Sequence, residues 1–393
     1  IGSIVIVGLA TAGCAPTLEG GEPREPSTTV PTQFYRTQSN IDPDQPPTVG
    51  TPEATVQKGR VAIFDSAELQ SLIEAALRGN QELNGRMQEI IIAQSEVMAR
   101  EGEVLPRLDG RVAVGVERVG KYTSQGVSDE AHGVPSILGD FTFGLTSSWE
   151  VDIWKKLRNA AKAASLHHRA TIEGRNFLVT QLVAEIARAY YELVALDNEL
   201  EVLQRNIRLQ EETLEVIRLQ KQAGEVTELA VQRFEAEVLK NKGRLYDVEQ
   251  ERIQTENRIN FLVGRYPQPV ARDARHFRDP LPPGIRSGLP AQLLGNRPDV
   301  RQAELELEAA KLDVKAAKAA FYPALSIDAG AGYQSFDAAH LVDTPDSVFF
   351  GLEAEMTVPL LNRKGIEAEY RSANARQIQA VYEYEKTVLQ AYT

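Results

Sequence analysis

The sequence is poor in cysteine and in positive charge, and both shortages limit what the chain can do. Cys14 is the single cysteine among 393 residues, so no disulfide bond can form within one chain. The 43 Lys and Arg residues are outnumbered by 55 Asp and Glu residues, which gives a formal net charge of −12. Nucleic-acid binding requires a concentrated positive surface, because the protein must neutralise phosphates. We therefore expect no nucleic-acid partner.

The sequence also lacks the short motifs of common catalytic and cofactor-binding sites. It contains no HExxH, no P-loop, no paired CxxC and no GxSxG. Its five histidines are scattered, and the adjacent pair His167 and His168 would point in different directions on a helix. We predict that the protein is not an enzyme and that it holds no cofactor and no metal.

No stretch reaches the roughly 20 consecutive apolar residues that a membrane-spanning helix needs. Residues 1–13 are apolar and suit the central region of a signal peptide. The small residues before Cys14 resemble a bacterial lipobox, in which the cysteine is lipidated; the alternative is a small buried residue in an apolar start. Residues 15–60 hold eight prolines and predict an extended tether.

The chain carries an internal duplication. With a shift of 217 residues, one position matches in type and three are identical: Leu307 with Ile90, Val314 with Val97, Pro323 with Pro106 and Leu325 with Leu108. Further along, Phe143-Gly144-Leu145 matches Phe350-Gly351-Leu352 with a shift of 207. Such a repeat is much longer than a solenoid unit. We predict a first repeat at 61–263, a linker at 264–294, and a second, incomplete repeat at 295–393.

Residues 160–262 contain no proline and predict a long antiparallel helical hairpin. Apolar residues recur every seven positions, as in a coiled coil, on both sides of Gly224. The two series mirror each other about Gly224, so we place the tip there, with Thr227 as N-cap of the returning helix. From these helices alone, a solvated coiled-coil arm is an equal alternative to the wall of a tube.

Four segments alternate between apolar and polar residues, at 108–118, 141–153, 325–334 and 348–358. Segments of about ten residues with one apolar face are typical of transmembrane β-barrels. The alternative is an ordinary antiparallel sheet with one face packed on helices. We predict that the polar face lines a water-filled lumen, with the acidic residues Glu117, Glu150, Asp152, Asp328, Glu353 and Glu355.

Four strands cannot close a barrel, and an open edge in lipid leaves backbone groups without hydrogen bonds. Bacterial barrels begin at about eight strands. The chain is therefore expected to form an oligomer, and a trimer would supply about twelve strands. The predicted fold class is an α+β membrane protein, with long helical hairpins and strands shared in an intersubunit barrel.

Two local sequences carry a resemblance to a known family. Residues 288–304, which include Arg297-Pro298-Asp299-Val300-Arg301, and residues 148–154 resemble signatures of the TolC family of outer-membrane efflux channels, in its NodT-type lipoprotein branch. The resemblance implies a homotrimer in the outer membrane of a Gram-negative bacterium, lipid-anchored, with a periplasmic helical domain. It also implies a periplasmic adaptor and an inner-membrane pump as partners. The implied adaptor-contacting tip comprises Ala223, Gly224, Glu225, Val226 and Thr227.

The resulting hypothesis is a passive conduit that exports small molecules in a tripartite efflux system. One alternative is a periplasmic coiled-coil lipoprotein that acts as a spacer or adaptor. Another is a TolC-like conduit for metal ions or for type I protein secretion. The acidic polar face predicts a preference for cations in any of the conduits.

Overall fold

The computed structural model describes residue 64, residues 66–273 and residues 295–392. Cys14, the proline-rich tether and most of the linker lie outside the described residues. The chain forms two compact units, and each unit draws on segments far apart in the sequence. The sheet unit contains 90–171 and 300–392, and the hairpin unit contains 66–89, 172–273 and 295–299.

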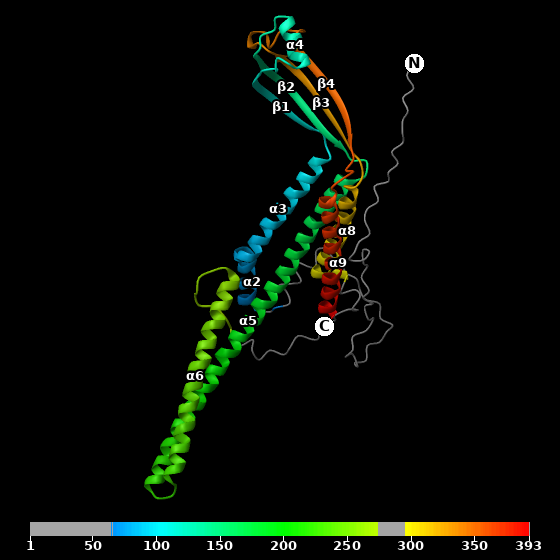
Figure 1. The fold of residues 1–393 in the computed structure, drawn as a ribbon. Coiled ribbons are helices and arrows are strands. Elements are labelled where there is room, and N and C mark those ends of the chain that lie inside the picture. Colours follow the sequence, from blue (N-terminus) through cyan, green and yellow to red (C-terminus); the bar gives the residue numbers. More distant parts are fainter. Residues whose placement is uncertain (1–63, 65, 274–294, 393) are drawn as a thin grey trace, which may run out of the picture. The chain divides into compact units, whose positions relative to one another are not determined.

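The sheet unit holds one four-stranded sheet, shown in Figure 1. Its strands are β1 (Arg107–Glu117), β2 (Leu138–Val151), β3 (Ala324–Ser335) and β4 (Val348–Thr357). They pair antiparallel in the order β1-β2-β3-β4, so β2 and β3 join the two repeats. All four predicted strands are confirmed, with ends that differ by a few residues.

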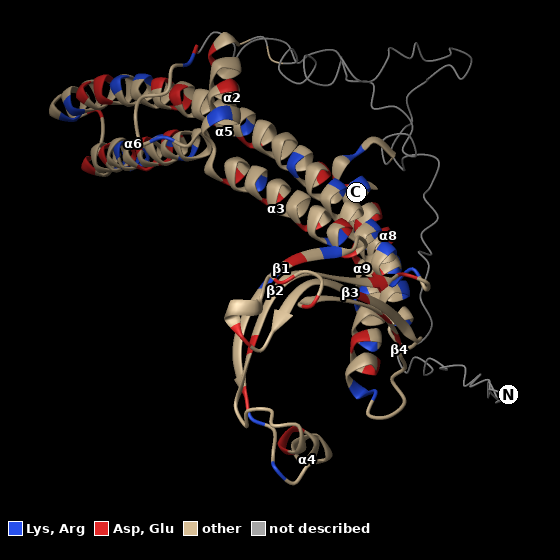
Figure 2. Cartoon of the chain, turned by 90° about the horizontal axis from the view of Figure 1, so that it is seen from above, with Lys and Arg blue, Asp and Glu red and all other residues tan. Residues whose placement is uncertain are grey.

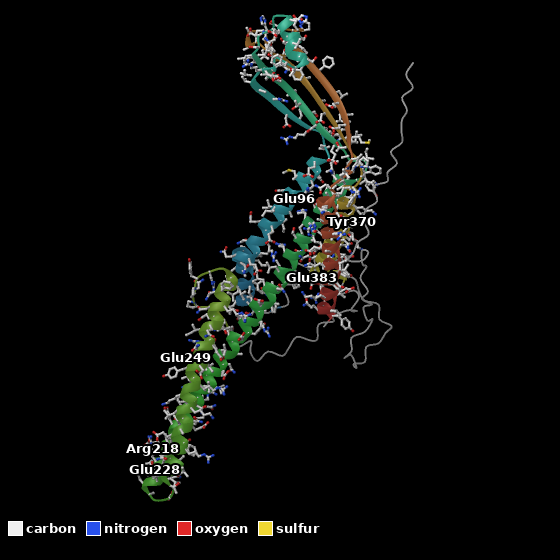
Figure 3. The ribbon with its side chains drawn as sticks, in the orientation of Figure 1. Glu96, Arg218, Glu228, Glu249, Tyr370 and Glu383 are labelled. Atoms are coloured by element: carbon white, nitrogen blue, oxygen red, sulfur yellow. The ribbon has the colours of Figure 1, made fainter. Side chains whose placement is uncertain are left out.

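Helices α8 (Pro298–Ala319) and α9 (Lys364–Tyr392) pack together in the same unit (Figure 1). Val314, Phe321, Tyr370 and Ala373 form their buried core. The ring of Phe321 meets that of Tyr370 edge to face, with ring centroids 5.8 Å apart; Tyr370 is labelled in Figure 3. Pro298 begins α8, where its missing N–H costs nothing. The short elements α4 (Ser124–Ala131) and η2 (Ala338–His340) lie in the loops that join the paired strands.

The long helices are α3 (Gln81–Glu103) and α5 (Lys156–Gln222). In the hairpin unit, α5 runs antiparallel to α6 (Glu228–Val263), and α2 (Ala67–Gly79) packs against its base. The predicted seam is largely confirmed. The side chains of Ile186, Leu193, Leu200, Ile207, Leu214, Val231, Val238, Val248 and Ile259 are all buried.

An ion-pair network ties the segment after α6 back onto the hairpin. The Arg272 guanidinium donates to Asp197 of α5 and, at 2.9 Å, to Glu256 of α6. Glu256 also accepts from the backbone N–H of Val270, whose side chain is buried in the core. These contacts connect α5, α6 and residues 270–272 at one position along the hairpin.

The C-terminus of α6 crosses the C-terminus of α2 at very short range. Gly264 ends α6 in the left-handed conformation, with φ of +80°. A Cβ atom at Gly264 would lie 2.1 Å from the carbonyl oxygen of Gly79. Asn80 stabilises the crossing, because its side-chain amide donates a hydrogen bond to the Leu262 carbonyl at 2.9 Å. Only glycine fits at position 264.

The substitution Gly264→Ala is therefore expected to lower the free energy of unfolding by about 2–4 kcal/mol, through left-handed strain and a backbone clash. Denaturant unfolding in detergent, followed by circular dichroism, measures the change. Gly243→Ala is the matched control, because Gly243 lies inside α6 with open space around it. The control should be neutral or stabilising by about 0.5–1 kcal/mol. Equal effects of the two substitutions would contradict the role assigned to the crossing.

Candidate functional site

The strand register separates the sheet into a charged face and an uncharged face. Cross-strand pairing aligns Asp328 with Glu353, and it aligns Glu150 with Ser326 and then Glu355. Glu117 lies on the same face near the opposite end of the sheet, opposite Leu138. Within the four strands this face carries seven carboxylates and two guanidinium groups: Asp109, Glu117, Asp140, Glu150, Asp328, Glu353 and Glu355, with Arg107 and Arg111. Five of the six acidic residues assigned to a lumen therefore share one face.

Two acids on this face pair with nearby cations, Asp140 is half-buried and accepts from the Gln334 side-chain amide at 3.0 Å, and the remaining four are exposed to solvent. Glu150 forms an ion pair with Lys156 at 2.5 Å, and Asp109 forms one with Arg107 at 2.8 Å. Asp328, Glu353 and Glu355 are exposed and lie close together in the register. The face therefore presents a concentrated negative surface where β3 and β4 approach the helices.

The assignment of Asp152 to the lumen-facing acidic residues is corrected by its position. It follows the end of β2, and its side chain is only 3% exposed. Its carboxylate accepts from the backbone N–H groups of Leu157 and Arg158, at 3.1 and 2.9 Å, in the first turn of α5. A carboxylate is favourable there, because the N-terminus of a helix carries unpaired N–H groups and partial positive charge. Asp152 caps a helix and does not face a lumen.

The opposite face of the sheet is apolar and uncovered. Within the strands it carries no charged residue, and the strands are mostly tan in Figure 2 whereas charged residues follow the helices. Val112 is 75% exposed, Phe350 is 87% exposed and Leu352 is 79% exposed. A sheet packed on helices would bury these side chains. That alternative is wrong for the described residues.

The hairpin tip is a tight turn closed by backbone hydrogen bonds and one ion pair. Gly224 has φ of +79°, and the N–H of Glu225 donates to the Gln220 carbonyl at 2.9 Å. Lys221 pairs across the turn with Glu228, and this bond lowers the pKa of the Glu228 carboxyl. Figure 3 labels Glu228 and Arg218 beside the tip.

Among the predicted tip residues, Val226 packs against the cluster of Leu214, Ile217, Val231 and Val238. Ala223, Gly224, Glu225 and Thr227 are exposed. Thr227 occupies the predicted N-cap position, although its hydroxyl makes no capping hydrogen bond. The exposed part of the tip thus offers small and polar side chains held in a fixed conformation.

A family profile decides the assignment of this architecture. The profile described as "Outer membrane efflux protein" matches residues 72–265 and 289–393. The chain belongs to the outer membrane efflux protein family. The resemblance inferred from the sequence is confirmed, and so is the fold class of long helices combined with a small sheet.

Characterised relatives of this efflux protein are distant but span most of its length. It is 27% identical over 329 residues to the pyoverdine export outer membrane protein OpmQ of Pseudomonas aeruginosa, covering 84% of this chain and 69% of OpmQ. It is 24% identical over 389 residues to the cation efflux system protein CusC of Escherichia coli K12, covering 98% of this chain and 80% of CusC.

Solved structures show the same fold. A membrane protein from Pseudomonas aeruginosa superimposes with a TM-score of 0.76 at 23% identity, over 96% of this chain and 80% of that chain. The outer membrane protein VceC of Vibrio cholerae superimposes with a TM-score of 0.72 at 25% identity, over 82% of this chain and 76% of that chain. The efflux protein is thus an outer membrane efflux channel component, from a family of channels rather than enzymes.

The described part of the efflux protein holds no group of three or more His, Cys, Asp or Glu residues arranged to bind a metal ion. His167 instead lies 3.7 Å from the carboxylate of Asp313 on α8, and this nearby carboxylate raises the pKa of the imidazole. None of the helices within the described residues is long and apolar enough to cross a membrane.

Proposed function

We propose that three copies of this efflux protein assemble into one conduit, with their sheets closed into a shared barrel around the acidic face. The observation that carries the proposal is the combination of an uncovered apolar face with two unpaired edges, β1 and β4. Unpaired edge strands are costly in lipid, because their N–H and C=O groups lack partners. Joining β4 of one copy to β1 of the next satisfies both edges and turns the apolar face toward lipid.

The hairpin carries a second apolar stripe on each helix, which supports the same assembly. On α5 the exposed residues Val202, Leu209 and Val216 recur every seven positions; on α6 they are Leu239, Tyr246 and Ile253. These stripes are distinct from the buried seam between α5 and α6. Heptad stripes specify helix–helix seams, so each helix is patterned to meet a further helix on its outer side. A tube wall requires two seams on every helix, whereas an isolated arm requires one.

The proposed setting is the outer membrane of a Gram-negative bacterium, with the hairpin in the periplasm. The tip at Ala223–Thr227 then contacts a periplasmic adaptor, and the adaptor connects the conduit to an inner-membrane pump. A lipid on Cys14 would tether the chain further. The rigid tip turn and the exposed Glu225 and Thr227 support a polar docking contact.

The proposed cargo is small molecules that pass along a water-filled lumen. Relatives are named for export of pyoverdine and of cations, which fits a conduit whose pump selects the cargo. The seven carboxylates on the polar face favour cations in transit. These carboxylates attract cations through their electrostatic field in the lumen and do not coordinate individual ions.

The mass of the detergent-extracted protein, its migration before and after heating, and its conductance in a planar bilayer together test this proposal. We expect a trimer that requires detergent, resists dissociation until heated, and gives stepwise conductance in a planar bilayer. A spacer or adaptor lipoprotein would instead give a water-soluble monomer or dimer once Cys14 is replaced. That result would reject the conduit.

A further inference from the structure

Two turns at the helix-side end of the sheet share an unusual backbone conformation. Lys155 has φ of +61° and Asn362 has φ of +50°, and they are the two non-glycine residues with positive φ among the described residues. They lie 207 residues apart, which is the shift that superimposes the second halves of the two repeats. Each residue joins a strand to a long helix, β2 to α5 and β4 to α9. The same strained turn therefore occurs in both repeats.

Each turn exposes two apolar side chains to solvent. Ile153 is 48% exposed and Trp154 is 47% exposed in the first turn. Leu360 is 64% exposed and Leu361 is 90% exposed in the second. Exposed apolar side chains gathered at equivalent points of a duplicated unit indicate a surface with a partner.

The Trp154 ring is held in a fixed orientation. Its indole N–H donates to the Pro323 carbonyl at 2.8 Å, and its ring lies 4.9 Å from that of Tyr322. Both contacts come from the turn that leads into β3. Tryptophan and tyrosine, with an apolar body and a polar tip, are enriched where a membrane meets water.

Cations accompany the apolar residues in a chain that is otherwise acidic. Lys155 and Lys364 are exposed, and neither forms an ion pair within the described residues. Residues 356–364 contain no acidic residue, and the single acid in 151–158, Asp152, is buried as a helix cap. Lysine side chains beside apolar residues extend their ammonium groups to lipid phosphates. The charge of the turns complements a phospholipid headgroup layer.

The two turns also continue the apolar face of the sheet. The last paired row of that face before the turns is Val151, Leu325 and Met356, and Met356 is 61% exposed. Ile153 lies two residues after Val151, and Leu360 lies four residues after Met356. The apolar surface therefore ends at the turns, and free ammonium groups begin there.

We propose that these two turns form an interfacial anchor, in which Ile153, Trp154, Leu360 and Leu361 enter the headgroup boundary of the phospholipid leaflet on the helix side of the sheet. Lys155 and Lys364 bind the phosphates at that boundary. The anchor rests on the proposed lipid-facing role of the apolar face. It fixes the depth at which the sheet sits.

Fluorescence quenching by brominated lipids tests the anchor. The chain has two tryptophans, so Trp149→Phe leaves Trp154 as the single indole. In vesicles of phosphatidylcholine brominated at different acyl depths, we expect the shallowest bromines to quench Trp154 most strongly. Quenching by aqueous iodide in place of lipid bromines would overturn the anchor. Protection from both quenchers would also overturn it, and would assign the turns to a contact with a second copy.

A second pair of variants, made in the same Trp149→Phe background, tests the turn that follows β4. Leu360→Asn combined with Leu361→Asn should shift the depth of maximum Trp154 quenching toward the aqueous side. Ile91→Asn combined with Ile92→Asn is the control, because these side chains are similarly exposed but lie on α3. An equal shift in both pairs, or no shift in either, would contradict the anchor.

Conductance recorded from the same vesicles separates this inference from the proposed function. Conducting vesicles in which lipid bromines fail to quench Trp154 would overturn the anchor alone. Protein that neither inserts nor conducts would reject the conduit itself.

Discussion

Gly332→Ala is expected to prevent the sheet from forming. Gly332 of β3 pairs with Gly144 of β2, and the two backbones approach so closely that a Cβ at position 332 would lie 2.3 Å from the Phe143 carbonyl oxygen. It would also lie 2.5 Å from the Gly144 Cα, so no side-chain movement relieves the clash. We expect a loss of about 3 kcal/mol or more in stability, because strand pairing must break or shift. Since β2 and β3 join the two repeats, the assembled oligomer should be lost as well.

Gly330→Ala is the matched control for this prediction. Gly330 lies two residues away on the same strand and the same face, and a Cβ there would meet its nearest atom at an ordinary 3.6 Å. Heat-modifiable migration of the extracted protein measures the outcome. We expect normal oligomers from Gly330→Ala and none from Gly332→Ala. Normal oligomers from both variants would show that the β2–β3 contact is looser than described.

Replacing Asp328 and Glu353 together by lysine is expected to reverse the ion selectivity of the conduit. The two side chains are direct cross-strand partners on the polar face, and both are exposed. Charged rings at close range set the sign of the permeant ion. The reversal potential in a salt gradient should indicate cation preference in the unmodified protein and anion preference in the double variant.

The neutral variant, Asp328→Asn with Glu353→Gln, provides the graded control. It should give an intermediate reversal potential, because it removes charge without adding the opposite sign. If all three proteins share one reversal potential, these carboxylates do not face the lumen. Anion preference in the unmodified protein would also contradict the assignment of the acidic face.

Patterns with a regular period could be predicted from the sequence alone. The alternation in 108–118, 141–153, 325–334 and 348–358 predicted the four strands, and the heptads around Gly224 predicted the hairpin. Each was placed to within a few residues, because burial on one face imposes those periods. The acidic face followed from the same alternation. Its pairing partners did not, since the register of Asp328 against Glu353 depends on which strands are neighbours.

Features that depend on distant contacts were missed or misjudged. Asp152 follows the strand alternation in sequence, but the chain leaves the sheet there and the carboxylate turns to the N-terminus of α5. The close approach of Gly332 to Gly144 requires knowledge that the two repeats pair through β2 and β3. The matching turns at Lys155 and Asn362 leave no sequence signal of their own, since lysine and asparagine are ordinary in loops.

Disulfide trapping tests most directly whether β4 of one copy joins β1 of the next. In a Cys14→Ser background, Val112→Cys on β1 is combined in turn with Val348→Cys, Phe350→Cys or Leu352→Cys on β4. All four positions lie on the apolar face. Within one chain, β2 and β3 separate these strands by about 14 Å at the usual strand spacing. A disulfide needs Cα atoms within roughly 7 Å, so no bond can form inside a single sheet.

Oxidation of the membrane-embedded protein should therefore link copies for at least one of the three pairs. On a non-reducing gel we predict covalent dimers and trimers and nothing larger, whereas Val112→Cys alone should remain monomeric. Three pairs that all stay monomeric in detergent-stable oligomers, or a ladder that extends beyond the trimer, would contradict the shared barrel.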